Sequence, residues 1–233
     1  MTQAAPRAGA PAAVALLAKT PGPGRVKTRL VPPLTTEEAA AVARACLTTT
    51  LRWLLPAAGL PCTLFLDGEP EPWIAALAAK RGIAVAPQAP GDLGARLLAA
   101  FHALRASGAA RVLAVGADSP TLPPERIPEA ARALDDADVV LGPTEDGGYY
   151  LVGARRGEET ILRDIPWSTE RVLEVTRARA AEAGLAVRLL PAWYDVDGPE
   201  DGKRLAEEAR RAGGAGGAVT ELRALLEALR GKL

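Results

Sequence analysis

Aspartate residues follow two of the apolar segments of this chain, near the points where those segments end. Asp118 comes just after the run 111–116, and Asp195 and Asp197 lie two positions apart after the last apolar run. In an extended backbone Asp195 and Asp197 point to the same side. Carboxylate oxygens suit Mg²⁺, or Mn²⁺, bound to a polyphosphate. The three residues are therefore candidate metal ligands, although Asp118 also suits a turn and Asp197 also suits a helix cap ahead of Pro199.

A loop rich in glycine, proline and basic residues occupies residues 19–30, between an apolar run and a polar step into an Ala-rich helical pattern. It places four cations close together, namely Lys19, Arg25, Lys27 and Arg29. Its glycines, among them Gly24, let the backbone approach a ligand closely, and clustered cations suit a polyphosphate. The loop is neither a Walker loop nor a dinucleotide fingerprint, and the alternative is a turn that carries solvated charges.

A second glycine turn carries Asp146 directly ahead of two adjacent glycines, Gly147 and Gly148. Asp146 is suited to accept a proton from an acceptor hydroxyl as a general base, and the glycines would allow the acceptor to approach. The alternative is an ordinary Asp-Gly turn. Two aromatic residues, Tyr149 and Trp167, suit either stacking on an acceptor or filling the core.

Strand-like and helix-like patterns alternate along the chain and predict the elements that position these residues. Apolar runs predict strands at 12–18, 62–66, 83–85, 111–116, 138–141 and 186–190. Helices are predicted at 35–55, ending before Pro56 and starting with a Thr35–Glu38 capping box, and at 72–80, 91–107, 124–134, 170–183 and 199–211. A strand after the second glycine turn is predicted to pair without a crossover helix. The pattern predicts an α/β fold with a mainly parallel, mixed sheet that binds ligands at the carboxyl ends of its strands.

The composition is that of a globular protein. Its 233 residues, 48% of them apolar, are enough for one substantial core. The 28 basic and 28 acidic residues balance, which argues against a general nucleic-acid or membrane binder. No apolar run suits a secretory or membrane segment, so we expect a cytoplasmic protein with a disordered leader at 1–12. Cys46 and Cys62 have neither the number nor the spacing for a disulfide framework or a zinc site.

The predicted folded domain spans residues 13–211. The glycine-rich stretch 212–217 has the composition of a flexible linker, and a helix is predicted at 218–233. Four leucines share one face of that helix, which is a packing surface either for this domain or for a partner subunit in a homodimer. They are Leu222, Leu225, Leu226 and Leu229.

Six motifs, in this order along the chain, resemble those of a bacterial family of GT-A-type glycosyltransferases of largely unassigned substrate. They are the loop 19–30, the turn 91–94, the step 116–120, the run 146–150, the loop 165–168 and the ending 195–200. The loop 26–30 is also similar to that of 2-phospho-lactate guanylyltransferases, and the ending to that of sugar-activating cytidylyltransferases. Those relatives usually have Thr where this chain has Gly198, which weakens the following helix cap.

The resemblance implies a nucleotide-diphospho-sugar transferase fold, which is a Rossmann-like, three-layer GT-A fold, and roles for individual residues. Asp118 and Asp197 would hold the metal, with Asp195 beside them, and Asp118 and Asp146 would be the catalytic carboxylates. The remaining roles fall into three groups, which are phosphate binding by Lys19, Gly24, Lys27 and Arg29, a base or sugar pocket at Gly91, Asp92 and Gly94, and acceptor binding by Gly147, Gly148, Tyr149 and Trp167.

Three functions fit these residues. The resemblance favours Mg²⁺-dependent transfer of a sugar from a nucleotide sugar to a small acceptor. The number of cations in the first loop favours the alternative, in which a phosphorylated substrate attacks a nucleoside triphosphate and releases pyrophosphate. A nucleotide-binding regulator without catalysis is the third, and the presence of every candidate carboxylate argues against it.

Overall fold

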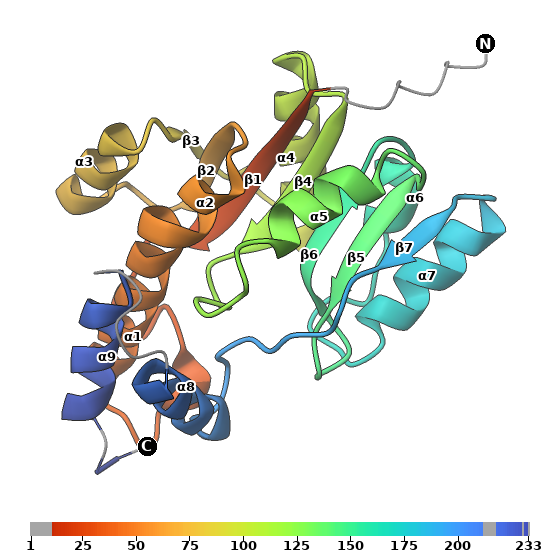
Figure 1. Cartoon of the computed structure of the whole chain (residues 1–233). Helices are drawn as coiled ribbons and strands as arrows, with labels where there is room; N and C mark the ends of the chain where they lie inside the picture. Colours follow the sequence, from red (N-terminus) through yellow and green to blue (C-terminus); the bar gives the residue numbers. More distant parts are fainter. Residues whose placement is uncertain (1–10, 212–217, 230, 233) are drawn as a thin grey trace.

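The computed structural model describes residues 11–211, 218–229 and 231–232, so residues 1–10 of the predicted leader at 1–12, and the predicted linker at 212–217, lie outside the described residues. A seven-stranded sheet with the order β3-β2-β1-β4-β6-β5-β7 forms its centre (Figure 1). Strand β6 runs antiparallel to β4 and β5, and the other pairs are parallel, which confirms the predicted mixed sheet. The strands are β1 (Ala12–Lys19), β2 (Cys62–Asp67), β3 (Ala84–Pro87), β4 (Arg111–Gly116), β5 (Val139–Pro143), β6 (Tyr149–Ala154) and β7 (Val187–Leu189).

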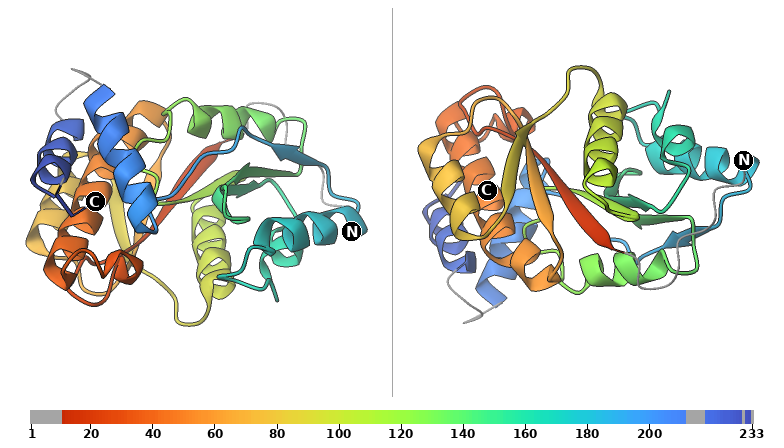
Figure 2. Two further views of the ribbon diagram at one scale, coloured as in Figure 1. Left: turned by 90° about the horizontal axis from the view of Figure 1, so that it is seen from below. Right: turned by 90° about the horizontal axis from the view of Figure 1, so that it is seen from above.

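Helices cover both faces of the sheet, as the two perpendicular views show (Figure 2). One face carries α1 (Thr36–Thr49), α2 (Leu55–Ala58), α3 (Pro72–Lys80) and α5 (Arg126–Ala133). The other face carries α4 (Leu93–Ala106), α6 (Glu158–Leu162) and α7 (Val172–Glu182). The sequence did not predict α6, because five residues are too few to show a helical period. In the described part of the chain, no helix has both the length and the apolar character that a membrane span needs.

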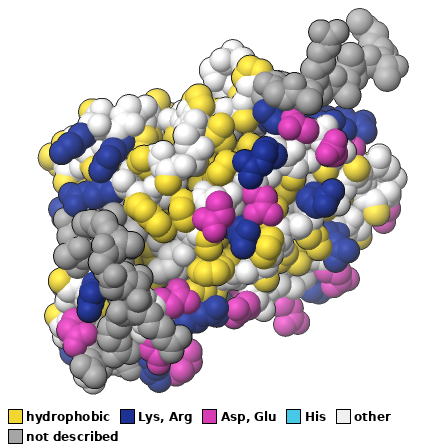
Figure 3. Space-filling model, in the orientation of Figure 1, with side chains coloured by type: hydrophobic (Ala, Val, Ile, Leu, Met, Phe, Trp, Pro, Cys, Tyr) yellow, Lys and Arg dark blue, Asp and Glu magenta, His cyan; other side chains and the backbone are white. Residues whose placement is uncertain are grey.

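Strand β1 shows why its sequence is apolar from Ala12 to Ala18. Val14 and Leu16 pack into the core on one face of the sheet, and Ala13 and Ala15 pack into the core on the other. Successive side chains of a strand point to opposite faces, so a strand covered by helices on both sides alternates between two cores. Most charged side chains lie at the surface, with Arg111 and Asp138 among the buried exceptions, and acidic and basic groups are interspersed on the face that Figure 3 shows.

The first helical segment differs from the prediction at its C-terminal end. We predicted that it stops at Pro56, but it continues through α2 and ends at Gly59, where φ is 66°. Proline has no backbone N–H to donate a hydrogen bond to the carbonyl four residues earlier, and in an α-helix its ring clashes with that carbonyl. The π-helical turn η2 (Thr50–Leu54) precedes it, and the amide of Leu55 bonds to the carbonyl of Thr50. The wider turn leaves room for the proline ring.

The C-terminal helix packs on its own chain. Helices α8 (Pro199–Arg211) and α9 (Ala218–Ala228) lie beside α1 at the lower left of Figure 1. Leu222 and Leu226 are buried in one cluster with Tyr194 and Val196, and Leu229 is buried beside α1. The predicted leucine stripe is therefore an intramolecular packing surface, and it holds the segment that carries Asp195 and Asp197.

A buried ionic group at the end of the sheet away from these aspartates sets a pH limit on stability. Asp138 accepts from Arg155 Nε at 3.0 Å, Arg156 Nε at 2.7 Å and the amide of Ala186 at 2.9 Å. Burial alone would raise its pKa, but the bonds from Arg156, Ala186 and Arg155 lower the pKa of Asp138 to about 2. The folded state therefore holds this carboxylate ionised at a pH where the unfolded chain, with a pKa near ~3.9, already binds a proton.

We expect Asp138→Asn to lower the free energy of unfolding by roughly 3–5 kcal/mol, because two arginines lose their buried partner. A depressed pKa adds stability that is fully present above about pH 4 and is lost as the pH falls toward 2. Urea unfolding of both proteins between pH 7 and pH 2.5 checks this. The stability difference should shrink at the acid end, and a difference that stays constant over that range would contradict the assignment.

Candidate active site

The carboxyl ends of the parallel strands and the first residues of β6 border one cleft of about 510 Å³. This is the edge of an open α/β sheet at which ligands bind. The loop 19–30 forms one side of the cleft. The other sides are formed by the residues after β4, the start of α4 and the segment after β7, with Lys19, Lys27, Arg29, Asp118, Asp195 and Asp197 all in the lining. The structure thus brings together residues that are far apart in sequence. Lys19 and Asp197, for example, are 178 positions apart.

Lys27 and Asp118 form the ion pair at the centre of the cleft. The Lys27 side chain is only 5% exposed, and its ammonium donates to the Asp118 carboxylate and, at 2.5 Å, to the carbonyl of Val196. Burial would lower the pKa of Lys27, but the charge of Asp118 more than offsets it and the pKa is raised. The amide of Val196 bonds in turn to the carbonyl of Asp118 at 2.9 Å. These contacts join the end of β4 to the segment after β7.

A second ion pair and a concentration of carboxylates lie beside the first. Arg29 Nη1 donates to Asp197 Oδ2 at 2.5 Å, and both side chains are largely exposed. Burial, and then the negative charges of Asp146, Asp118 and Asp197, raise the pKa of Asp195 to about 6. Asp118, Asp146, Asp195 and Asp197 are therefore close enough for their charges to interact, beside the two cations Lys27 and Arg29.

This group of carboxylate oxygens fits a divalent cation of the Mg²⁺ or Mn²⁺ type. The predicted ligands are nevertheless not assembled into a finished site, because no three Asp, Glu, His or Cys side chains of the described residues converge on one point. Asp118 and Asp197 instead hold cations of the chain itself. Such metals commonly keep several waters and take further oxygens from substrate phosphates, so two carboxylates are a sufficient protein contribution.

The cations of the loop divide into two kinds. Lys27 and Arg29 are compensated by carboxylates, whereas Lys19 and Arg25 are exposed and make no ion pair within the described residues. All four line the cleft. An anionic ligand would therefore gain most from Lys19 and Arg25. Gly24 has φ of 70° in this loop, a conformation that glycine adopts without strain.

The turn before α4 shapes the cleft differently from the prediction. The Asp92 side chain caps α4 by accepting from the amide of Ala95 at 2.8 Å. A Cβ on Gly94 would lie 2.3 Å from the carbonyl oxygen of Leu162, so this glycine permits close packing of α4 on α6. Gly91, Asp92 and Gly94 are absent from the cleft lining in the described chain, and the polar residues that face it from this region are Gln88 and Arg96.

Sequence reasoning missed Gln88 and Arg96 because a single polar residue in a loop and a single arginine in a helix have no distinctive local pattern. Arg96 lies one helical turn after Leu93 on α4, and Leu93 remains 43% exposed at the cleft.

The turn with Asp146 lies next to the cleft. Asp146 Oδ1 accepts from the Thr144 hydroxyl at 2.5 Å and from the amide of Gly148 at 3.1 Å, which is the bonding of an Asp-Gly turn. A Cβ on Gly147 would lie 2.0 Å from the carbonyl oxygen of Glu170, so Gly147 is required for backbone packing. Asp146 is close enough to Asp195 for its charge to act on that residue. The acceptor-binding roles of this turn stay predictions.

Tyr149 and Trp167 form an edge-to-face pair with ring centroids 6.1 Å apart. Both pack against the core on the α4 side of the sheet, Tyr149 borders the cleft, and Trp167 lies against Gly94. The Tyr149 hydroxyl and the Trp167 indole N–H are both buried without a hydrogen-bond partner in the described structure. Packing is therefore observed for both rings, and a contact with an acceptor stays a prediction.

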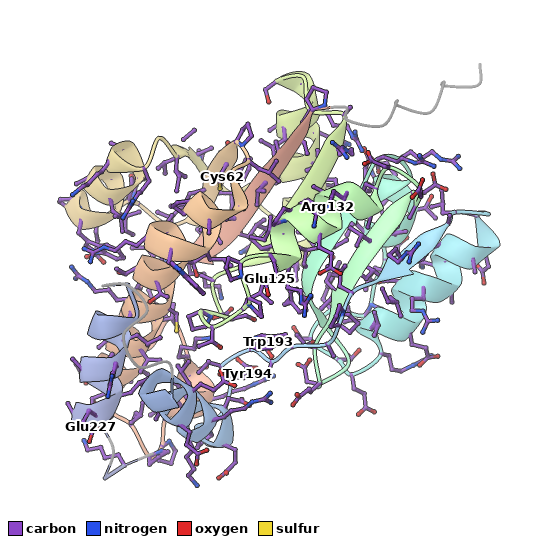
Figure 4. All side chains as sticks on the ribbon, in the orientation of Figure 1. Cys62, Glu125, Arg132, Trp193, Tyr194 and Glu227 are labelled. Atoms are coloured by element: carbon purple, nitrogen blue, oxygen red, sulfur yellow. The ribbon has the colours of Figure 1, made fainter. Side chains whose placement is uncertain are left out.

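Arg204 of α8 connects the two loops that carry the carboxylates. Its Nη1 lies 2.9 Å from Glu145, next to Asp146, and its guanidinium lies 3.9 Å from the centroid of the Tyr194 ring. Tyr194 directly precedes Asp195, and its hydroxyl donates to Glu208 at 2.7 Å. Figure 4 labels Tyr194 and Trp193 on the segment between β7 and α8. Helix α8 thus fixes the position of this segment relative to the turn.

The fold is that of nucleotide-diphospho-sugar transferases, and nucleotidyltransferases share it. The chain belongs to the family described as "Uncharacterized protein conserved in bacteria (DUF2064)", whose model matches residues 50–169. No match was found among curated proteins.

Solved structures support the fold assignment. A proposed nucleotide-diphospho-sugar transferase from Desulfovibrio desulfuricans G20 is 27% identical, with 93% of this chain and 97% of that chain covered and a TM-score of 0.81. A CMP:2-keto-3-deoxy-manno-octonic acid synthetase complexed with CTP is 14% identical, with coverages of 86% and 99% and a TM-score of 0.54. The manganese complex of Rv0371c from Mycobacterium tuberculosis H37Rv is 19% identical, with coverages of 85% and 98% and a TM-score of 0.50.

Proposed function

We propose that this protein is a divalent-metal-dependent glycosyltransferase, which transfers a sugar from a nucleotide-diphospho-sugar to a small acceptor. The supporting observation is the number of uncompensated cations. Among the described residues five cations line the cleft, and carboxylates pair with three of them, Lys27, Arg29 and Arg96. Lys19 and Arg25 remain available to the phosphates of a donor, and the likeness to a proposed nucleotide-diphospho-sugar transferase favours a diphosphate donor. The sequence argument for a triphosphate counted all four loop cations and is weakened by this pairing.

The residues of the cleft divide the work of the reaction. Lys19 and Arg25 bind the diphosphate. Asp118 and Asp197 would hold the metal, which would neutralise negative charge on the leaving diphosphate. Asp146, next to the cleft, takes the proton from the acceptor hydroxyl, and the oxygen of that hydroxyl bonds to the sugar carbon. The bond from that carbon to the diphosphate breaks, and the nucleoside diphosphate leaves with the electron pair.

The manganese and CTP complexes of proteins with this fold agree with a metal and a nucleotide in the cleft. The CTP complex also favours the second candidate, in which a nucleoside triphosphate is cleaved between its α and β phosphates. In that reaction a phosphate oxygen of the other substrate attacks the α phosphorus and pyrophosphate leaves.

The products distinguish the two reactions without knowledge of the acceptor, because water can replace it slowly. The protein is incubated with Mg²⁺ or Mn²⁺ and a panel of nucleotide sugars or nucleoside triphosphates, and the products are separated by ion-exchange chromatography. We expect one nucleotide sugar to release nucleoside diphosphate. Pyrophosphate from a triphosphate, with every nucleotide sugar intact, would establish the nucleotidyltransferase instead.

A further inference from the structure

Arg96 is held at the cleft by acceptors from two segments, the end of β2 and the loop between β3 and α4. Its Nε donates to the carbonyl of Gly91 at 3.0 Å, and its Nη1 lies 3.0 Å from Asp67 Oδ2 and 3.4 Å from Gln88 Oε1. Gln88 is itself fixed, since its Nε2 donates to the carbonyls of Ala18 at 2.8 Å and Phe65 at 3.0 Å. The guanidinium therefore has one orientation before any ligand arrives.

The second terminal nitrogen, Nη2 of Arg96, has no hydrogen-bond partner among the residues that the structure describes. The side chain is 28% exposed and lines the cleft, so this nitrogen offers two N–H donors to a ligand. Asp67 already compensates the positive charge of Arg96. A compensated arginine suits a neutral acceptor such as a carbonyl, whereas a phosphate would gain more from Lys19 and Arg25, which are uncompensated.

The surface beside Arg96 is apolar. Leu93 and Leu97 lie on the same face of α4 as Arg96, and Leu17 at the end of β1 completes this part of the lining. A cleft wall that combines apolar area with one oriented polar group is typical of a small-molecule subsite. It matches a flat ring that covers the leucines and presents hydrogen-bond acceptors at its edge, and a sugar with hydroxyls on all sides matches it less well.

We propose that Arg96 selects the nucleobase of the donor, and that it selects a base with a keto oxygen where adenine and cytosine carry their exocyclic amino group, which is O6 of guanine or O4 of uracil. This inference rests on the proposed use of a nucleotide. Guanine presents the O6 and N7 acceptors and uracil presents the O4 acceptor to an arginine, whereas adenine and cytosine carry an amino donor at the corresponding position. Two N–H donors facing an amino group would be left unpaired, which weakens the binding of those bases.

The test measures binding of GDP, UDP, ADP, CDP and pyrophosphate by isothermal titration calorimetry, all with Mg²⁺. Variants are Arg96→Lys and Arg96→Ala, with Arg81→Ala as the control. Arg81 is an exposed arginine that caps the end of α3 and does not line the cleft. We expect the parent to bind GDP or UDP at least about 10-fold more tightly than ADP and CDP, the size of one good arginine-to-base contact. Both Arg96 variants should lose that preference and keep the parent affinity for pyrophosphate.

Several results would overturn the inference. A parent that binds ADP or CDP as tightly as GDP and UDP has no keto preference. Arg96 variants that keep the preference show that Arg96 only supports the fold, and variants that lose pyrophosphate affinity in the same proportion show that it binds phosphate. If the parent binds neither pyrophosphate nor any nucleotide, the proposed function fails and this inference fails with it.

Discussion

Asp197→Asn is expected to abolish metal-dependent turnover of the nucleotide donor while the protein stays as stable as the parent. The metal would lose one of its two carboxylates, and neutralisation of the leaving phosphates is worth several kcal/mol, or about 10²-fold or more in rate. Asp197 is 43% exposed and its partner Arg29 is 68% exposed, and exposed pairs contribute little to stability. Donor turnover and urea unfolding, each with and without Mn²⁺, give the two measurements.

Asp118→Asn is the companion variant, and it should differ in stability. Lys27 is buried beside Asp118, so the variant leaves that ammonium without a charge partner and should lower the free energy of unfolding by roughly 1–3 kcal/mol. Turnover should fall as it does in Asp197→Asn. Metal-dependent turnover that persists in both variants would show that the two ion pairs are purely structural.

The double variant Lys19→Ala/Arg25→Ala should weaken binding of a nucleoside diphosphate by roughly 2–5 kcal/mol, taking 1.5–3 kcal/mol for each charged hydrogen bond and some overlap. The corresponding nucleoside, which has no phosphates, should bind as it does to the parent. Stability should not change, because both side chains are exposed and make no ion pair within the described residues. Calorimetric titration with nucleoside and nucleoside diphosphate provides the comparison.

Lys80→Ala/Arg81→Ala is the matched control, because it removes two exposed cations from the end of α3, outside the cleft lining. It changes the net charge by the same amount and should leave both affinities unchanged. An equal loss in the two double variants would mean that general attraction is being measured. An equal loss for nucleoside and nucleotide would place Lys19 and Arg25 at the base instead of the phosphates.

Local sequence determined much of the framework. The Thr35–Glu38 capping box forms as predicted, with the Thr35 hydroxyl accepting from the Glu38 amide at 3.2 Å, because every group that it needs lies within four residues. Helix α3 has the predicted bounds of 72–80, since a proline at its start and the Gly82 turn after its end are local signals. Asp118, Asp195 and Asp197 could be assigned to one edge of the sheet, because each follows a strand and parallel strands end together.

The tertiary structure alone decided which charges meet and which stay available to a ligand. Lys27 pairs with a residue 91 positions away and Arg29 with one 168 positions away, and a list of loop cations contains no information about either partner. The same holds for Gly94, which faces a carbonyl of α6, and for Arg96, whose orientation depends on Asp67 and Gln88. Caps, turns and strand periodicity depend on residues close in sequence, so the sequence determined them. Ion pairing and close packing depend on distances between segments, which exist only once the chain is folded.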